Sequence, residues 1–247
     1  RSPRGLTPTD LAESLRPHLA EMHAAAAAAL RDATAAADSS RGVVRVAASD
    51  VMGAEVLPGI LAGFQDRYPN ITIELVLSNK TEDLSRRDAD IAVRMVRPTQ
   101  GSLVARKVGT TGLGFYATSG YLERRGVPAS LDELENGHTV IGFDRQAPSL
   151  EALSNVDIGR ELTRDIFDFR SDNDLALLSA VRAGLGIGAV QHALARRANL
   201  VPVLSNAFQF ELDVWVAMPE TLKGSQRMRL MFDYLVDGLS AFVAEGR

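Results

Sequence analysis

Two periods of hydrophobic and polar positions divide the chain into two parts. Over residues 8–38 the apolar positions recur every three or four residues, which is the spacing of one face of a helix. After residue 42, short apolar or alternating runs are separated by amphipathic helical segments. This order of strands and helices predicts an α/β protein that follows one long helix.

The long helix carries a narrow apolar stripe. Thr7 suits its N-cap, and Pro8 suits its first helical position. A narrow stripe fits a partner helix better than the core of its own chain, so we expect this helix to join copies of the chain. The alternative is a surface helix that lies on its own domain. The residues expected to mediate oligomerisation are Leu11, Leu15, Leu19, Met22 and Leu30.

The second part alternates strands with helices. Strands are expected at 42–48, 71–77, 90–95, 103–108, 113–117, 139–143, 164–169, 187–191 and 212–218. Helices are expected at 54–68, 81–87, 172–183 and 226–243. Ser171 is expected to cap the helix at 172–183, and Gly184 to end it in the left-handed conformation.

The composition of the chain excludes several classes of functional site. The 247 residues include no cysteine, which excludes disulfides, thiolate nucleophiles and cysteine-based zinc sites. The net charge of −4 gives the chain no electrostatic footprint for nucleic acid. Because no apolar run reaches about 18 residues and no apolar leader follows Arg1, we expect a cytoplasmic chain that does not contact membranes.

Motifs for catalysis are missing from the sequence. It holds no nucleophile elbow, phosphate-binding loop or zinc-protease motif, so we expect no enzymatic activity, cofactor or metal. The stretch 184–189 (GLGIGA) matches the dinucleotide fingerprint, but a helix precedes it and a strand follows it. The fingerprint needs the opposite order, and we therefore expect Gly186 to allow close approach of the turn to the sheet.

Three stretches together resemble LysR-type transcriptional regulators without their DNA-binding head. Residues 1–15 (RSPRGLTPTDLAESL) resemble the end of a winged helix-turn-helix and its linker helix. Residues 42–69 (GVVRVAASDVMGAEVLPGILAGFQDRYP) resemble the opening strand and helix of the effector domain. Residues 178–190 (LSAVRAGLGIGAV) match a third stretch, with Gly188 where alanine is commoner. Thr7-Pro8 and the absent recognition helix depart from the family pattern.

The resemblance implies a particular architecture and domain division. Two lobes with mixed, mostly parallel doubly wound sheets flank a ligand cleft, and two strands cross between them near 115–118 and 214–216. Residues 1–7 are then a remnant of the winged-helix domain, and residues 8–41 are the linker helix and linker. Lobe I comprises residues 42–117 and 214–247, and lobe II comprises residues 118–213. The resemblance also implies dimers or tetramers, with DNA bound only through the missing domain.

The fold places a binding site at the carboxyl ends of its strands. Two helix N-termini directed into one cleft favour a small organic anion, with Arg94 or Arg97 as its charged partner. The alternatives are plain helix capping by Ser49 and Ser171 and a salt bridge from Arg94 to Asp90 or Asp88. The residues expected to bind the effector are Ser49, Asp50, Val51, Ser78, Asn79, Arg94, Arg97, Thr118, Phe143 and Ser171.

Two other functions are compatible with this fold. The first is a solute-binding protein of a transport system, and the second is an enzyme with the same two lobes. The long helix and the missing leader argue against the first, and the missing catalytic motifs argue against the second. The leading hypothesis is the effector-sensing and oligomerising region of a bacterial LysR-type regulator.

Overall fold

A computed structural model of the chain describes residues 8–35, 41–79, 89–99, 102–144, 164–207 and 210–246. The helices and helical turns are α1 (Asp10–Ala35), η1 (Met52–Val56), α2 (Leu57–Arg67), α3 (Ser119–Arg125), α4 (Leu131–Gly137), η3 (Arg164–Ile166), α6 (Asp174–Arg182), α7 (His192–Arg197), η4 (Glu220–Leu222) and α8 (Gln226–Glu245). The strands are β1 (Gly42–Ala48), β2 (Ile71–Leu77), β3 (Ile91–Arg94), β4 (Leu103–Ala117), β5 (Val140–Phe143), β6 (Phe169–Ser171), β7 (Ile187–Gln191), β8 (Val201–Val203) and β9 (Phe210–Pro219).

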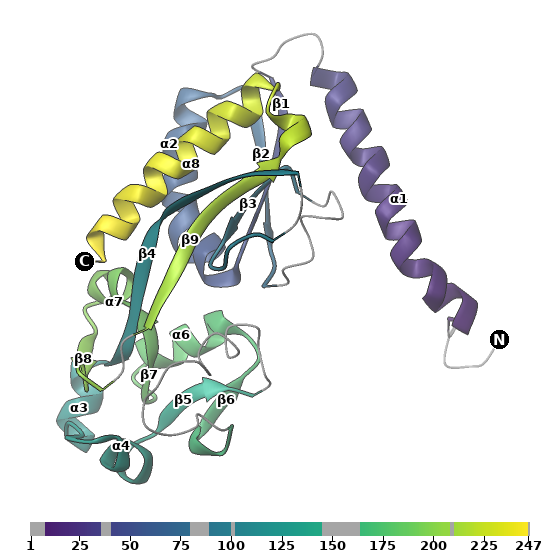
Figure 1. Ribbon diagram of the computed structural model, residues 1–247. Coiled ribbons are helices and arrows are strands. Elements are labelled where there is room, and N and C mark those ends of the chain that lie inside the picture. The colour runs from purple at the N-terminus through teal and green to yellow at the C-terminus, as the bar shows by residue number, and fades with distance from the viewer. Residues whose placement is uncertain are drawn as a thin grey trace.

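One mixed sheet runs through both lobes, in the order β2-β1-β3-β9-β4-β7-β5-β6, with β8 also paired to β4. Parallel pairing joins β1 to β2 and β3 in lobe I, and β5 to β6 and β7 in lobe II. The strands that link the lobes pair antiparallel, so less of the described sheet is parallel than the sequence predicts. The predicted two-lobed α/β architecture is confirmed (Figure 1).

Two long strands connect the lobes. β4 is one continuous strand, whereas the sequence predicts two strands separated at 109–112. The glycine-containing stretch stays extended because it pairs with β9 throughout, with one register shift between Lys107 and Gly109. The predicted crossing at 214–216 lies on β9, but the one predicted at 115–118 lies too far along the chain, because 115–117 of β4 already pair with β7 and β8 and Thr118 follows the strand. Residues 108–112 of β4 lie between the register shift after Lys107 and Leu113, where the pairing with β7 begins.

The hydrophobic core of lobe I lies between the sheet and two helices. α2 and α8 are side by side on one face of the sheet, where Phe64 packs edge to face against Tyr234 with ring centroids 5.4 Å apart. Leu235 and Leu239 of α8 are fully buried. Burying side chains of this size contributes about 1.5–3 kcal/mol each, so these two helices fix the strands that carry the site.

Helix boundaries differ from the prediction at several ends. The first helix begins at Asp10, and Thr9 caps it because its Oγ1 accepts a hydrogen bond from the Ala12 amide at 3.2 Å. Thr7 lies outside the described residues. Asn173, not Ser171, caps α6, since its Oδ1 accepts from the Ala176 amide at 3.0 Å. The predicted helix at 81–87 also lies outside the described residues.

The predicted strand at 164–169 is wrong in its first half. Residues 164–166 form a helical turn, and the strand occupies 169–171 instead. The Asp168 carboxylate causes the offset, because it accepts a hydrogen bond from the Val140 amide at 2.8 Å and ends the turn beside β5. The other predicted strands match observed strands within one or two residues, apart from the merged β4, whereas β8 is not among the predicted strands.

Candidate functional site

A cavity of about 190 Å³ lies between the two lobes. Lobe I supplies the residues after β1, β2 and β3, and lobe II supplies the ends of β5 and β7 and the first turns of α6. Its lining is mostly apolar, with few polar groups. This combination is typical of sites for small organic molecules.

Six of the ten predicted site residues line this cavity. They are Ser49, Val51, Ser78, Asn79, Arg94 and Phe143. Asp50 lies directly behind them, and its backbone amide donates to Asn79 Oδ1 at 3.0 Å. The rule that ligands lie beyond the carboxyl ends of strands therefore brought together residues from three separate loops.

Three predicted residues lie outside the cavity lining. Arg97 is exposed, with its guanidinium over the Trp215 ring at 5.8 Å. Thr118 caps α3, and its Oγ1 accepts from the Tyr121 amide at 3.2 Å. Ser171 ends β6, where its Oγ accepts from the Asn173 amide at 3.1 Å. Each hydroxyl has a local backbone partner, and local capping is the usual role of such residues.

Arg94 brings a positive charge to the cavity wall. It is the last residue of β3 and only 5% exposed. Its Nη1 donates to the Ser78 carbonyl at 3.2 Å, which places the guanidinium beside the end of β2. A buried cation of this kind strongly favours a nearby anion, because few water molecules compete for it.

Asn79 joins the lobes at the edge of the cavity. Its Nδ2 donates to Asp50 Oδ2 at 3.1 Å and to Asp174 Oδ2 of α6 at 3.0 Å. Burial raises the pKa of the Asp174 carboxyl, the charge of Asp50 raises it further, and the hydrogen bond from Asn79 offsets part of this rise. The hydrogen bond from Asn79 is stronger to the ionised carboxylate, whereas protonation of Asp174 relieves its repulsion from Asp50 and the cost of burying its charge.

A second contact between the lobes is an ion pair. Arg182, the last residue of α6, donates two hydrogen bonds to Glu55 of η1, at 2.9 and 2.7 Å. Both side chains are half-buried. A bidentate arginine–carboxylate pair fixes direction as well as distance, so it orients α6 relative to lobe I.

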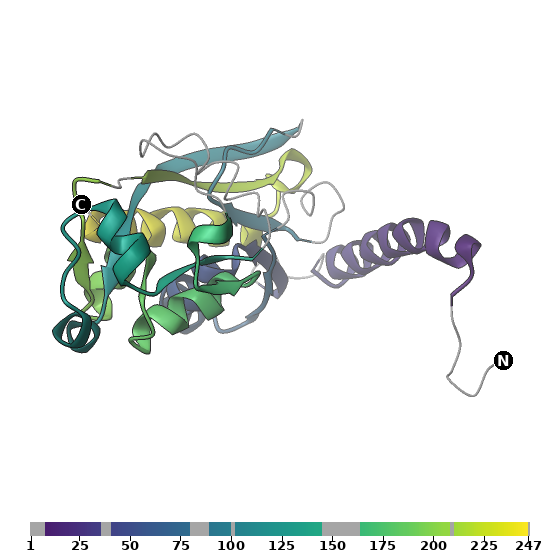
Figure 2. The ribbon, with the colours of Figure 1, turned by 90° about the horizontal axis from the view of Figure 1, so that it is seen from below.

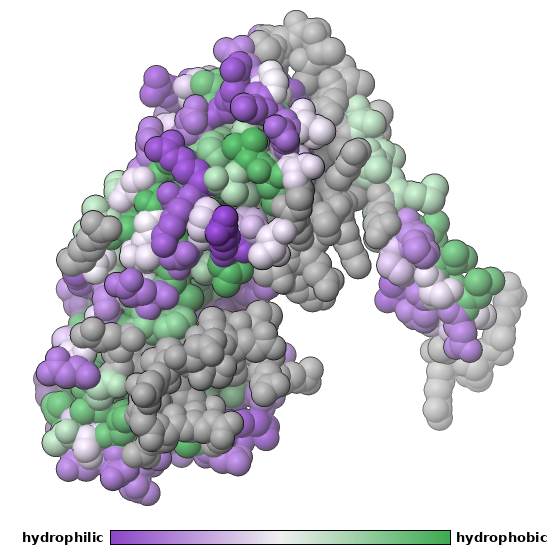
Figure 3. All heavy atoms as spheres, in the orientation of Figure 1, coloured by the Kyte–Doolittle hydropathy of each residue, from purple (hydrophilic) through white to green (hydrophobic). Residues whose placement is uncertain are grey.

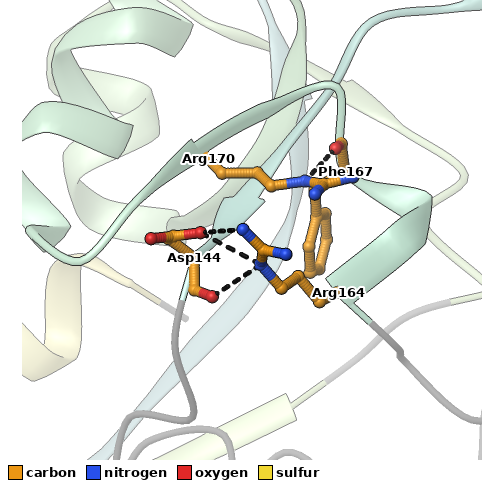
Figure 4. Close-up of polar contacts among 4 residues, drawn as sticks. All are labelled: Asp144, Arg164, Phe167 and Arg170. Carbon is orange, nitrogen blue, oxygen red and sulfur yellow. Dashed lines mark hydrogen bonds and ion pairs between the residues drawn. The ribbon is translucent and has the colours of Figure 1, made fainter.

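Polar contacts hold Asp144, the residue that follows β5, and the start of β6 (Figure 4). Asp144 follows Phe143 directly, and Arg164 donates to Asp144 Oδ1 from Nη2 at 2.6 Å and from Nε at 3.0 Å. Arg170 Nε donates to the Phe167 carbonyl at 2.7 Å. These contacts tie both ends of the β5–β6 pair together.

Two histidines have lowered pKa values but stand away from the cavity. Burial and the nearby Arg196 lower the pKa of His192, whose Nδ1 is 2.8 Å from the Tyr116 hydroxyl. Burial and Arg125 lower the pKa of His138, while Glu133 opposes them. Tyr116 itself packs in the hydrophobic core. Within the described part of the chain, no cluster of acidic or histidine side chains is arranged to hold a metal ion.

Comparison with known proteins identifies the family. The family model of the LysR substrate binding domain matches residues 37–240. This chain belongs to the LysR family. Its LysR domain is similar to the HTH-type transcriptional regulator CrgA of Neisseria meningitidis, with 28% identity over 86% of this chain and 72% of that protein. An uncharacterised HTH-type transcriptional regulator of Haemophilus influenzae is 30% identical over 64% of this chain, and the match spans 56% of that relative's length.

Solved structures agree with this assignment. The CrgA regulatory domain from Neisseria meningitidis superposes with a TM-score of 0.71 and 26% identity, covering 81% of this chain and 99% of that one. The structure of CrgA itself gives a TM-score of 0.71 over 97% of this chain and 82% of that one. The relatives are named transcriptional regulators, which agrees with the expected non-enzymatic role and favours regulation over transport.

The long helix of this LysR-family chain projects from the rest of the molecule (Figures 1 and 2). Its apolar side chains face solvent, with Leu11 67% and Met22 68% exposed, and Leu15 and Leu19 are exposed as well (Figure 3). The side chain of Leu30 lies outside the described residues. No helix among the described residues is both long and apolar enough to cross a membrane.

The sequence does not predict two of the polar residues that line the cavity between the lobes. They are Asp174 in the first turn of α6 and Gln191 at the end of β7, and neither is among the site residues predicted from the sequence. The signal for Gln191 was present, because a polar residue closing an apolar strand at its carboxyl end follows the same rule that located Ser49. The apolar partners Leu113 and Phe210 carry no comparable signal, since core residues have the same composition.

Proposed function

We propose that this chain is the effector-sensing region of a cytoplasmic LysR-type transcriptional regulator and that it binds a small organic anion in the cavity between its lobes. The observation that carries the proposal is the position of Arg94, a buried cation in an otherwise mostly apolar cavity wall. Ser49 and Ser78 line the same wall, and a serine hydroxyl is a group that can donate a hydrogen bond to a carboxylate. The anionic group therefore belongs at the lobe I side.

Ligand binding is sensed because the cavity takes its walls from both lobes. A ligand in contact with Arg94 on one side and with α6 on the other stabilises the lobe arrangement that permits both contacts. The pairs Asn79–Asp174 and Glu55–Arg182 already span the same gap. The two crossing strands are the covalent route for any change in the angle between the lobes.

We also propose that copies of the chain associate through α1. The helix has exposed leucine residues at spacings of four, and no described element of the chain covers them. Helices with such a stripe associate through apolar knobs that pack into holes of a partner helix. DNA is contacted by a separate DNA-binding domain of the whole regulator, and the dimer brings two such domains together.

Binding of organic anions to the wild-type protein tests the ligand class. Suitable probes are benzoate, cyclohexanecarboxylate and pentanoate, each with one carboxylate and a body that suits the cavity volume. Arg94→Met should weaken binding of any of these anions by about tenfold to a hundredfold, because a hydrogen bond to a charged group contributes about 1.5–3 kcal/mol. Isothermal titration calorimetry measures the change.

Arg97→Met is the matched control for this test. The substitution is identical and lies three residues away, but Arg97 stacks on Trp215 outside the cavity. The affinity of this variant for the same anions should equal that of the wild type. Failure of all three anions to bind, or equal affinities in Arg94→Met and wild type, contradicts an anion site at Arg94. Circular dichroism confirms that both variants are folded.

A further inference from the structure

Gln191 lines the cavity and carries a buried side-chain oxygen that has no hydrogen-bond partner among the described residues. The residue is 8% exposed, and this oxygen is its Oε1. Leaving a buried acceptor unsatisfied costs about 1–3 kcal/mol, and most buried polar groups in proteins are paired. A carboxamide at the cavity wall without a partner among the described residues suits a hydrogen-bonding group on a ligand.

The neighbours of Gln191 form an apolar row across three strands. Leu113 of β4 pairs with Gln191 of β7 on one side and with Phe210 of β9 on the other. All three residues line the cavity. Directly paired residues place their side chains on the same face of a sheet, so this row has one hydrogen-bonding group, Gln191, at its end beside two hydrophobic side chains.

The cavity volume limits the size of the ligand. An apolar protein cavity of about 150 Å³ holds one benzene molecule, and this cavity measures about 190 Å³. The space therefore suits one six-membered ring, or an aliphatic body of the same size, with small substituents.

We propose that Gln191 is a specificity-determining residue that binds a hydroxyl group on a ring-sized, otherwise apolar ligand. The inference rests on the proposed function, in which Arg94 binds the anionic group of the same ligand. Oε1 accepts a hydrogen bond from the hydroxyl, and the amide Nε2 can donate one to its oxygen, so a hydroxyl suits either end of the carboxamide. The ligand class is a hydroxylated monocarboxylate with one ring.

Matched pairs of compounds that differ by one hydroxyl group test this role. Benzoate is compared with 3-hydroxybenzoate and with 4-hydroxybenzoate. Cyclohexanecarboxylate is compared with 4-hydroxycyclohexanecarboxylate. In the wild type, at least one hydroxylated compound should bind tenfold or more tightly than its parent, because a site built to bond a hydroxyl discriminates against an analogue without it. Calorimetric titration provides the ratio of dissociation constants.

Gln191→Leu removes the carboxamide at nearly constant size. The variant should bind each hydroxylated compound and its parent with equal affinity, while affinity for the parent stays within about threefold of the wild type, the usual scatter of single contacts. The unliganded variant should also melt at a higher temperature than the wild type, since a buried unsatisfied acceptor has been replaced by an apolar group. A lower melting temperature would mean a structural role and would overturn the inference.

Thr111→Val is the matched control. Thr111 lies on β4, is 1% exposed, and its Oγ1 also has no hydrogen-bond partner among the described residues, but it does not line the cavity. This variant should gain thermal stability like Gln191→Leu and keep the wild-type preference for the hydroxylated compound. Loss of the preference in both variants would overturn a specific role for Gln191.

The outcomes separate this inference from the proposed function. If parent and hydroxylated compounds bind the wild type equally and Arg94→Met weakens both, the anion site stands and the role of Gln191 is overturned. If no compound binds the wild type, the proposed anion site for a ring-sized ligand and the proposed hydroxyl contact of Gln191 are both overturned. If the preference is present and disappears only in Gln191→Leu, both are supported.

Discussion

At the scale of single residues, Asn79 is the point where both lobes meet through one side chain. Its amide nitrogen donates hydrogen bonds to two carboxylates, that of Asp50 from lobe I and that of Asp174 from lobe II. Two like charges at one donor repel each other, and burial makes the charge on Asp174 less favourable still. The contact therefore couples the protonation of Asp174 to the stability of the protein.

The raised pKa of Asp174 has a definite sign in the stability profile. The folded protein binds this proton more tightly than the unfolded chain, so the stabilisation is complete below the ordinary value of 3.8 and is lost as pH rises through the raised pKa. The difference in free energy of unfolding between wild type and Asp174→Asn should therefore decrease as pH rises. Urea denaturation at several pH values measures it.

Asp172→Asn provides the comparison for this profile. Asp172 is exposed and lies two residues before Asp174, so the same charge is removed next to the same helix. The profile of this variant should run parallel to that of the wild type over the window in which Asp174→Asn diverges. Parallel profiles for both variants would show that Asp174 is not the titrating group.

At the scale of elements, the turn between α6 and β7 sets the position of these two elements, which both line the cavity. Gly184 adopts φ of +72°, the amide of Leu185 donates to the Ala180 carbonyl, and the amide of Gly184 donates to the Val181 carbonyl. This pair of bonds is a Schellman motif, and it confirms the left-handed residue predicted from the sequence. The turn then passes directly against the Thr139 carbonyl, which accepts from the Ile187 amide at 2.9 Å.

Two glycines of this turn should respond differently to alanine. A Cβ on Gly186 would lie 2.2 Å from the Thr139 carbonyl oxygen, a backbone atom that cannot move aside without breaking its bond to β7. Gly186→Ala should therefore destabilise the fold by about 3 kcal/mol or more, whereas Gly184→Ala should cost about 1–2 kcal/mol for its positive φ. Urea unfolding midpoints order the two variants.

Gly59→Ala is the reference substitution for this series. Gly59 lies in α2, and a Cβ added there would have no neighbouring atom within 4 Å, so the new methyl group meets open space. Alanine should stabilise the helix at this position by about 0.5–1 kcal/mol. Equal losses for Gly186→Ala and Gly184→Ala would refute the close approach to the Thr139 carbonyl.

The sequence predicted elements better than it predicted side-chain partners. Periodicity located β1, β2 and β7 at their observed bounds, because buried strands leave a regular apolar pattern. It did not distinguish Asn173 from Ser171 as the cap of α6, since both residue types cap helices and lie two positions apart. Which of them caps depends on where β6 ends, and pairing of β6 with β5 sets that point.

The candidate site was predictable only where backbone topology determines it. Ser49, Ser78 and Arg94 follow strands that lie side by side, so strand order alone brings them together. Arg97 is three residues further along, and its side chain stacks on Trp215 instead. Gln191 ends β7 and follows the same strand-end rule, whereas its apolar neighbour Leu113 required knowledge of cross-strand register, because the two residues are far apart in the chain.

At the scale of the whole molecule, α1 is the helix whose apolar side chains are exposed rather than packed against the rest of the chain. Its exposed leucines contrast with the fully buried leucines of α8, although both helices carry an apolar stripe. Apolar surface in water is unfavourable in proportion to its area, so a helix of this kind gains most from a second copy. Association through α1 is thus a property of the assembly rather than of one chain.

A charge placed within the α1 stripe should separate the copies. Leu15→Glu or Leu19→Glu puts an acidic group at a position where a partner helix would bury it, and an unpaired buried charge is costly. Light scattering after gel filtration should show the wild type as an oligomer and these variants at lower mass. Ala20→Glu introduces the same charge on the opposite side of the helix and should keep the wild-type mass.

Equal masses for all variants would exclude α1 as the association surface. The cavity tests remain valid in that case, because every cavity residue lies at position 49 or beyond. Association and ligand binding are thus separable by mutation.

The pairing of β4 with β9 also has a consequence for how the chain can be divided. Leu113 of β4 lies opposite Phe210 of β9, so the chain leaves lobe I and returns to it at adjacent points. In covalent terms, everything between these two residues is the loop of one very long hairpin. Closing a longer loop costs little, about 0.6 kcal/mol for each doubling of its length. Residues 114–209 therefore form an insertable module, and a short turn in their place would leave the five strands β2-β1-β3-β9-β4 connected and in order.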